Sequence, residues 1–345
     1  MAIQSFIFHR ITRWQEDRPA ELQLCETAMQ ITADHEALFS QLKKLFQFRA
    51  GKFYGQFDED YASAPFQNWL REHLKHKISF EQLSHLYLKQ LKEHVDLTSE
   101  TFEASILLIL EDRADGPRCY IFVLETSAGL QLDNALQLDT VDYLNTSKLD
   151  LALRIDLDDW QTLSNHKNEP KETPYLCMVR GRSNAKIGEA FTQSTGFKNS
   201  IDTVKETEML MDVLAGYTHQ TEAKKAAQIR KKAYDFCVEQ QQLGEAVPLN
   251  ELSGYLDENE PTHFSEFAEQ NADIDVQKSL RPDTRKLKHL VRISGKGNGL
   301  SLSFSSDLIQ QTILFDEKTD TLTITTIPKS LKKQLIEHLK EKSEE

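Results

Sequence analysis

Cysteine is scarce in this 345-residue sequence, and the few cysteines present do not form a reactive pattern. The four lie far apart, at Cys25, Cys119, Cys177 and Cys237. Because no two of them make a C-x-x-C pair, the sequence predicts neither a zinc site nor a redox-active disulfide. Reduced and mostly buried thiols, as in cytoplasmic proteins, are the expectation.

Long hydrophobic runs are also missing. No window of about 18 apolar residues occurs, so no membrane-spanning helix is expected. The first ten residues, MAIQSFIFHR, lack the apolar core and the small-residue cleavage site of a secretory signal. The sequence therefore predicts a cytoplasmic protein without a membrane contact, and its 39 % hydrophobic content is enough for a sizeable core.

Positive charge is in deficit, with 41 Lys and Arg against 54 Asp and Glu and a net charge of −13. This balance lacks the basic footprint of a nucleic-acid binder, so any such site has to be local. The charge is unevenly distributed along the chain. Residues 239–275 hold ten acids and no Lys or Arg, whereas residues 278–296 hold seven cations and one acid, Asp283. Such blocks create local electrostatic fields that are not apparent from the net charge of the whole chain.

Catalytic motifs are absent as well. The sequence contains no H-E-x-x-H, no G-x-S-x-G and no phosphate-binding loop of the Walker type. We predict no catalytic residue, metal or cofactor. A magnesium-dependent nuclease or phosphohydrolase using Asp156 or Glu125 stays open as a lesser alternative. A structural ion pair between Arg154 and Asp156 is favoured over it.

The pattern of apolar residues predicts an α+β fold with an antiparallel or mixed sheet and flanking helices. The clearest hairpin has two nearly continuous apolar arms around the turn Asp115-Gly116-Pro117, which indicates a central, two-sided position in the sheet. The predicted strands are 3–13, 21–26, 105–112, 118–125, 149–157 and 175–179. The predicted helices are 34–49, 66–76 and 80–95.

Three domains are expected along the chain. Residues 1–198 form the α+β sheet domain, and residues 199–277 form a helical region with the acidic segment, including helices at 203–219 and 222–242. Residues 278–345 combine a basic segment with a small β-hairpin plus helix unit. The hairpin pairs strands around 312–316 and 321–325, and an amphipathic basic helix follows Pro328.

The first candidate site for phosphate lies where the apolar run from Tyr175 ends in Arg180, Gly181 and Arg182, with Lys186 soon after. Arginine can bind two phosphate oxygens at once, and glycine allows close approach of the backbone. The second candidate site comprises Arg285, Lys286, Lys288, Arg292 and Lys296. The stretch Gly295-Lys-Gly-Asn-Gly299 is read either as a phosphate-contacting loop or as a plain turn or bulge. For the cations, solvated surface ion pairs are the alternative.

Several blocks of the sequence are similar to the nucleoid-associated NdpA family, the 37-kDa nucleoid-associated proteins of bacteria. The blocks are Tyr143-Leu144, Leu149 to Leu157 with Trp160, Tyr175-Leu176 with Gly181-Arg182 and Lys186, Tyr234 with Cys237, Phe264 to Phe267, Gly295 to Leu300, and Phe315 to Ile324. The resemblance covers nearly the whole chain. It implies a cytoplasmic, nucleoid-associated protein that binds DNA. Because no catalytic motif is present, we expect that the protein is not an enzyme.

The function expected from these observations is DNA-backbone binding with weak sequence specificity through the two cationic clusters. The alternative is an adaptor whose acidic 239–275 segment docks onto a chromosome enzyme such as a topoisomerase. The sequence leaves open the choice between single- and double-stranded DNA, and a homodimer through the helix at 222–242.

Overall fold

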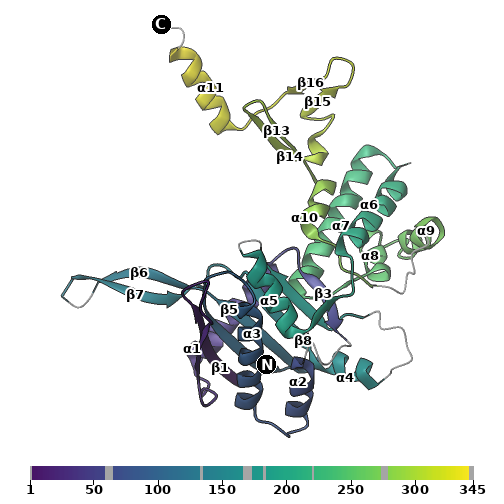
Figure 1. The fold of residues 1–345 in the computed structure, drawn as a ribbon. Helices are drawn as coiled ribbons and strands as arrows, with labels where there is room; N and C mark the ends of the chain where they lie inside the picture. Colours follow the sequence, from purple (N-terminus) through teal and green to yellow (C-terminus); the bar gives the residue numbers. More distant parts are fainter. Residues whose placement is uncertain are drawn as a thin grey trace. The chain divides into compact units, whose positions relative to one another are not determined.

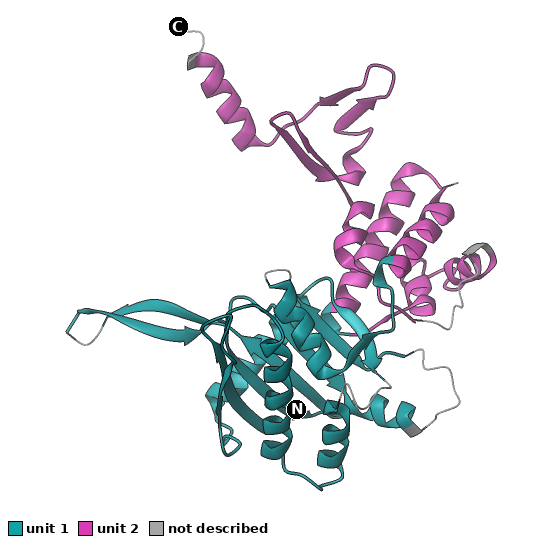
Figure 2. Ribbon diagram, viewed as in Figure 1, with its two compact units in different colours: residues 1–204, 242–244 teal, residues 205–241, 245–345 magenta. Residues whose placement is uncertain are grey.

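The computed structural model describes residues 2–58, 65–132, 135–165, 173–181, 184–219, 221–272 and 279–341 (Figure 1). The chain divides into two compact units (Figure 2). Unit 1 comprises residues 1–204 and 242–244, and unit 2 comprises residues 205–241 and 245–345. The predicted α+β class is confirmed, and the predicted division at 198 and 277 stays a prediction. None of the described helices is long and apolar enough to cross a membrane.

Unit 1 is built on a sheet that has eight strands in the described residues. All strand pairs are antiparallel, and the order is β10-β3-β9-β8-β5-β4-β1-β2. The strands are β1 (Ala2–Arg13), β2 (Glu21–Leu24), β3 (Phe53–Phe57), β4 (Phe102–Asp112), β5 (Arg118–Leu124), β8 (Leu151–Asp156), β9 (Leu176–Arg180) and β10 (Phe197–Asn199). The predicted hairpin is the central β4–β5 pair.

Helices cover both faces of this sheet, which explains why its central strands read as continuous apolar runs. One face packs against α2 (Phe66–Leu74), α3 (Phe80–Asp96), α4 (Leu157–Asn165) and α5 (Ala185–Thr195), and the other against α1 (Ala33–Phe48). Side chains alternate along a strand. Ile106 and Leu108 of β4 therefore join the first core, while Leu107 and Ile109 join the second.

The helices predicted at 34–49, 66–76 and 80–95 are α1, α2 and α3, and their ends agree within two residues. Five features of unit 1 were not predicted. Two are the helices α4 and α5, and two are the strands β3 and β10. The fifth is the hairpin of β6 (Thr126–Leu132) and β7 (Leu138–Leu144), a separate two-stranded ribbon that projects from the sheet (Figure 1).

Unit 2 begins with a helical core. It contains α6 (Thr203–Thr218), α7 (Ala223–Leu243), α8 (Leu249–Leu256) and α9 (His263–Ala272), and β11 (Val247–Pro248) pairs with β12 (Ser279–Leu280). The apolar stripe of α7, which includes Ile229, Ala233 and Cys237, is buried against Leu210 and Leu214 of α6. The sequence left open a homodimer through the helix at 222–242. In the structure, the apolar stripe of this helix is buried within unit 2.

The chain continues through a short helix α10 (Thr284–Leu287) and the 3-10 turn η1 (Lys288–Leu290) into two hairpins and a last helix. The elements are β13 (Arg292–Gly297), β14 (Leu300–Ser305), the 3-10 turn η2 (Ser306–Leu308), β15 (Ile313–Asp316), β16 (Thr321–Ile324) and α11 (Lys329–Glu341). The predicted C-terminal hairpin and helix are confirmed as β15–β16 and α11.

The structure corrects the loop reading of residues 295–299. Gly295, Lys296 and Gly297 lie in β13, paired with β14. Only Asn298 and Gly299 form the turn, with φ angles of 50° and 77°. A two-residue Asn-Gly turn supplies both positive φ angles that a tight hairpin of this kind requires, so the residues on either side are free to pair.

Candidate nucleic-acid interface

The first cationic cluster lies at the end of β9 and the start of α5. Arg180 is the last residue of β9, and Asn184 caps α5 by accepting a hydrogen bond from the Ile187 amide at 3.1 Å. The amide of Gly181 donates to the Asp150 carbonyl oxygen at 2.6 Å. A Cβ atom at position 181 would lie 2.7 Å from the Asp150 carboxylate, so a larger residue here would displace the Asp150 side chain.

The cations of this cluster have partners within unit 1. The Arg180 guanidinium lies over the Phe53 ring, 5.0 Å from its centroid. The Nζ atom of Lys186 is 2.9 Å from the Glu100 carboxylate, whose hydrogen bond raises the pKa of Lys186. Lys186 remains exposed, and Arg182 lies outside the described residues. Arg180 and Lys186 therefore have different neighbours, because Arg180 lies against Gly188 of α5 whereas Lys186 reaches Glu100.

A cavity of about 290 Å³ adjoins Gly181, and its lining is acidic. It includes the carboxylates of Glu103, Glu125 and Asp150 together with one lysine, Lys148. Asp150 forms ion pairs with Lys148 at 2.5 Å and with Arg49 at 3.1 Å. Three carboxylates against one lysine make the cavity itself a poor place for a phosphate.

The cations at 285 and 286 are tied into the fold of unit 2. Asp283 caps α10, and its carboxylate accepts hydrogen bonds from the Arg285 amide and from the Arg285 guanidinium, the shortest at 2.9 Å. This bond to Asp283 raises the pKa of Arg285. Lys286 reaches Glu208 of α6 at 3.3 Å. Lys288 follows in η1. These residues help to fix the start of the C-terminal hairpins.

Arg292 and Lys296 lie on one face of the β13–β14 hairpin. Directly opposed residues of an antiparallel pair share a face, and Arg292 pairs with Ser305 while Lys296 pairs with Ser301. Ser294 and Ser303 form the pair between them, and the Arg292 Nε donates to the Ser303 hydroxyl at 2.7 Å. This polar hairpin face, made of residues 292, 294, 296, 301, 303 and 305, carries two cations, four hydroxyls and no acid.

A groove of about 750 Å³ adjoins this face within unit 2. Its lining comes from the end of α6, the first half of α7, Val291 and residues 305–311. Three cations of α7 take part, namely Lys224, Arg230 and Lys231, together with one acid, Asp307. Ser305, the cross-strand residue of Arg292, also lines it. We call this the basic groove.

The groove residues were not among the predicted contacts, although the signal was present in the sequence. Residues 222–232 contain five Lys and Arg and one acid, Glu222. Helical spacing separates the four lysines from the buried stripe of α7, whereas the half-buried Arg230 lies beside that stripe, four residues after the buried Ala226. Three of them also have contacts. Arg230 donates to the Thr218 hydroxyl at 3.1 Å, Lys231 lies 3.6 Å from Asp235, and Lys232 donates to the Leu256 carbonyl oxygen at 3.1 Å.

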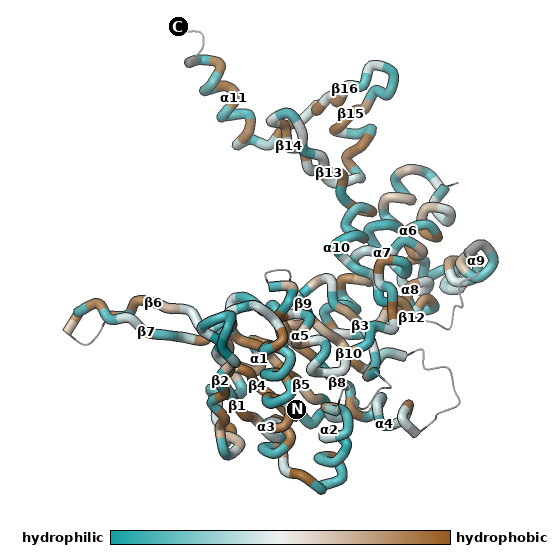
Figure 3. The backbone as a smooth tube through the Cα atoms, in the orientation of Figure 1, coloured by the Kyte–Doolittle hydropathy of each residue, from teal (hydrophilic) through white to brown (hydrophobic). Residues whose placement is uncertain are grey.

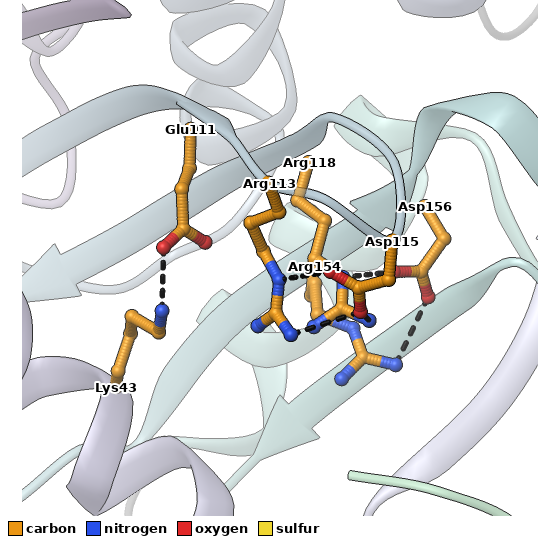
Figure 4. Close-up of polar contacts among 7 residues, drawn as sticks. All are labelled: Lys43, Glu111, Arg113, Asp115, Arg118, Arg154 and Asp156. Atoms are coloured by element: carbon orange, nitrogen blue, oxygen red, sulfur yellow. Dashed lines mark hydrogen bonds and ion pairs between the residues drawn. The ribbon is translucent and has the colours of Figure 1, made fainter. Parts of the chain in front are cut away.

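The carboxylate of Asp156, one of the two considered for metal chemistry, is held by arginines (Figure 4). Asp156 lies 2.7 Å from Arg118 Nε and 2.9 Å from Arg154 Nη2, which confirms the predicted ion pair between Arg154 and Asp156. Burial alone would lower the pKa of Arg154, but the charge of Asp156 raises it. Glu111 is paired with Lys43 at 2.5 Å. Among the described residues, no group of three His, Cys, Asp or Glu side chains is placed to hold a metal ion.

Comparison with known proteins gives a match over almost the whole chain. A family model described as nucleoid-associated protein YejK matches residues 7–332. A nucleoid-associated protein of Aliivibrio salmonicida is 30 % identical over 346 residues, covering 98 % of each chain. Nucleoid-associated proteins of Vibrio campbellii and Azotobacter vinelandii are 28 % and 27 % identical, over 96 % and 97 % of this chain and 98 % of their own lengths. The resemblance inferred from sequence blocks is confirmed.

Proposed function

The chain belongs to the YejK family of nucleoid-associated proteins, and from that premise we propose that it binds the DNA backbone through unit 2. The polar hairpin face and the basic groove make up the proposed interface. One observation carries the proposal. Ser305 belongs to both surfaces, so the cations of β13 and those of α7 border one continuous, hydroxyl-rich region.

The chemistry of this region suits phosphate. Arg and Lys side chains and Ser hydroxyls make most contacts to the DNA backbone, and these contacts carry no sequence information. Binding through Arg292, Lys296 and the groove cations is therefore weakly sequence-specific. The whole chain carries a net charge of −13, so the part outside the interface is acidic. It repels DNA and restricts the orientation in which DNA is bound.

The cluster of Arg180, Gly181, Arg182 and Lys186 is a second, weaker contact in this proposal. Glu100 and Asp150 lie beside it and offset its charge. Arg285, Lys286 and Lys288 contribute mainly by fixing the segment that leads into β13, since two of them are paired with acids.

We propose no catalytic step. The Asp156 carboxylate, the central residue of a nuclease alternative, already accepts contacts from Arg118 and Arg154. A carboxylate held by two guanidiniums has few lone pairs left for magnesium.

The test is a salt series of DNA-binding titrations with the wild type and an Arg292→Ala, Lys296→Ala double variant. Loss of two phosphate contacts makes the slope of log K against log salt shallower by roughly 0.9 per contact and weakens binding about tenfold or more. The matched control is Lys44→Ala, Lys89→Ala, which removes two exposed lysines from unit 1. Equal effects of the two double variants would refute the proposed interface.

The adaptor role is the second candidate, and the exposure of the acidic segment favours it. Five glutamates on or between α8 and α9 are exposed, at positions 251, 258, 260, 266 and 269. Such a surface suits a basic protein partner that binds DNA. Capture of a chromosome enzyme that is lost on Glu266→Gln, Glu269→Gln substitution, with no DNA binding by the pure protein, would establish this role in place of the first.

A further inference from the structure

The cavity of about 290 Å³ beside Gly181 lies at one edge of the sheet of unit 1. Four antiparallel strands meet at this edge, where β4 and β8 begin and β5 and β9 end. The strands are hydrophobic along their centres, as the brown segments within unit 1 in Figure 3 show. The cavity therefore adjoins the hydrophobic core on one side and the polar strand ends on the other.

The lining of this cavity combines apolar and acidic side chains. Its buried apolar residues are each at most 8 % exposed, namely Val123, Leu151 and Ile187. Its acids are more accessible, since Glu103 and Asp150 are half-buried and Glu125 is exposed. Small-molecule sites typically combine an apolar lining with a few charged groups that orient the ligand. A ligand with a hydrocarbon body and positively charged ends matches this lining.

Two of the three carboxylates are not neutralised by a cation of the protein. Asp150 is paired with Lys148 and Arg49. Glu103 and Glu125 form no ion pair with any residue that the structure describes. The hydrogen bond to Asp150 and, to a smaller extent, the charge of Glu125 raise the pKa of Lys148, so the cavity favours positive charge. Glu103 and Glu125 thus leave two negative charges for a ligand.

A hydroxyl of the lining also lacks a partner. The Oγ1 atom of Thr126 is buried and has no hydrogen-bond partner among the described residues. Buried polar groups are normally hydrogen-bonded, so this oxygen is free to accept a hydrogen bond from a ligand. A metal ion does not fit the lining, because no three His, Cys, Asp or Glu side chains of the described residues are placed to hold one.

From this lining we propose that the cavity binds an aliphatic polyamine, a chain of methylene groups that carries two or more ammonium groups. The ammonium groups pair with Glu103 and Glu125, and the methylene groups pack over the apolar residues, as the stem of a lysine does. A volume of about 290 Å³ lies at the lower end of the roughly 300–1,000 Å³ of small-molecule sites, which suits a short diamine or triamine. The site belongs to unit 1 and does not depend on DNA binding by unit 2.

The test is isothermal titration calorimetry of the full chain, without DNA, with the diamine putrescine. We expect saturable binding of one putrescine per chain. Butylamine has the same four-carbon chain and a single ammonium group, and it is expected to bind about tenfold more weakly or less, because one charge-assisted contact is lost. Magnesium at the same concentration should not displace putrescine.

A Glu103→Gln, Glu125→Gln variant keeps the size of both side chains and removes their charges. It is expected to bind putrescine at least about tenfold more weakly than the wild type. The matched control is Glu72→Gln, Asp112→Asn, which removes two exposed carboxylates of unit 1 outside the cavity lining. This control should leave the affinity unchanged, and circular dichroism verifies the fold of both variants.

Three results would overturn the inference. The first is the absence of saturable binding at millimolar putrescine. The second is an equal loss of affinity in both double variants, which would assign the binding to the net negative charge of the chain. The third is tighter binding of an α-acetylated lysine amide than of putrescine, because the cavity would then accept the lysine side chain of a protein.

Discussion

Arg292 and Ser305 face each other across the β13–β14 hairpin, and Ser305 also lines the basic groove beside α7. This register connects two cationic segments that are about sixty residues apart in the sequence. The proposed DNA interface therefore depends on the pairing of one short hairpin, and changes that loosen the hairpin should weaken binding without removing any charge.

Gly299→Ala is a direct way to loosen it. Gly299 has a φ angle of 77°, where alanine is strained, and we expect the hairpin to lose about 1 kcal/mol of stability or more. Amide hydrogen exchange of residues 292–305 should become faster. Gly297→Ala is the matched control, because this glycine pairs in β13 and a Cβ there meets nothing within 4 Å. Equal exchange in both variants would argue against the tight turn.

The cluster in unit 1 should contribute less to binding than the hairpin. An Arg180→Ala, Lys186→Ala variant removes two cations, as Arg292→Ala, Lys296→Ala does, but Glu100 already offsets Lys186. We expect a loss of about two- to threefold in DNA affinity, against about tenfold for the hairpin variant. Parallel titrations at one salt concentration compare the two, and the reverse order would make unit 1 the main contact.

The buried ion pairs of unit 1 should matter for stability. Asp156→Ala leaves the guanidiniums of Arg118 and Arg154 without their shared carboxylate, and both are at least 90 % buried. Removing one side of a buried pair costs about 3–5 kcal/mol, which urea unfolding would detect. Asp112→Ala, at an exposed position of β4, should change stability by less than about 0.5 kcal/mol. A small loss for Asp156→Ala would mean that its pairs are dispensable.

His9 should make unit 1 less stable at acidic pH. Burial, with a smaller effect of His85, lowers the pKa of His9 to about 4, and its Nδ1 accepts a hydrogen bond from the Cys25 amide at 3.2 Å. The unfolded chain, with a pKa near 6.5, binds this proton more tightly, so stability is complete above about pH 6.5 and falls as the pH drops towards 4.

At about 1.4 kcal/mol per pKa unit, the loss at pH 4 reaches up to about 3 kcal/mol. His9→Asn keeps an acceptor near the Nδ1 position and cannot be protonated. Urea unfolding between pH 4 and pH 7.5 should show a flatter stability profile for this variant than for the wild type. Profiles with the same slope would assign the acid sensitivity to other groups.

Most of the sheet could be predicted because burial leaves a clear pattern in the sequence. The apolar arms of β4 and β5, and the leucine stripes of α1 and α3, identify these elements without a structure. The β6–β7 hairpin has no such pattern, since it is exposed on both faces. Strand β13 contains two glycines and a lysine, which are atypical of a strand, so it was not predicted. The sequence Asn298-Gly299 could have indicated a hairpin at this point.

The candidate site was only partly predictable for a related reason. Clusters of cations are visible in the sequence, but the acids that offset them come from distant segments, such as Glu100 beside Lys186 and Glu208 beside Lys286. The groove depends on tertiary packing of α7 against residues 305–311. The cations of the groove could be identified in the sequence. Their spacing did not predict the groove itself or its position beside the hairpin.

Hydrogen exchange of the full chain with and without duplex DNA tests the central claim most directly. The proposed interface predicts DNA-dependent protection of residues 224–231 and 291–306, which weakens as salt is raised. Protection confined to 180–187, or to the acidic helices α8 and α9, would contradict it, as would exchange that DNA leaves unchanged.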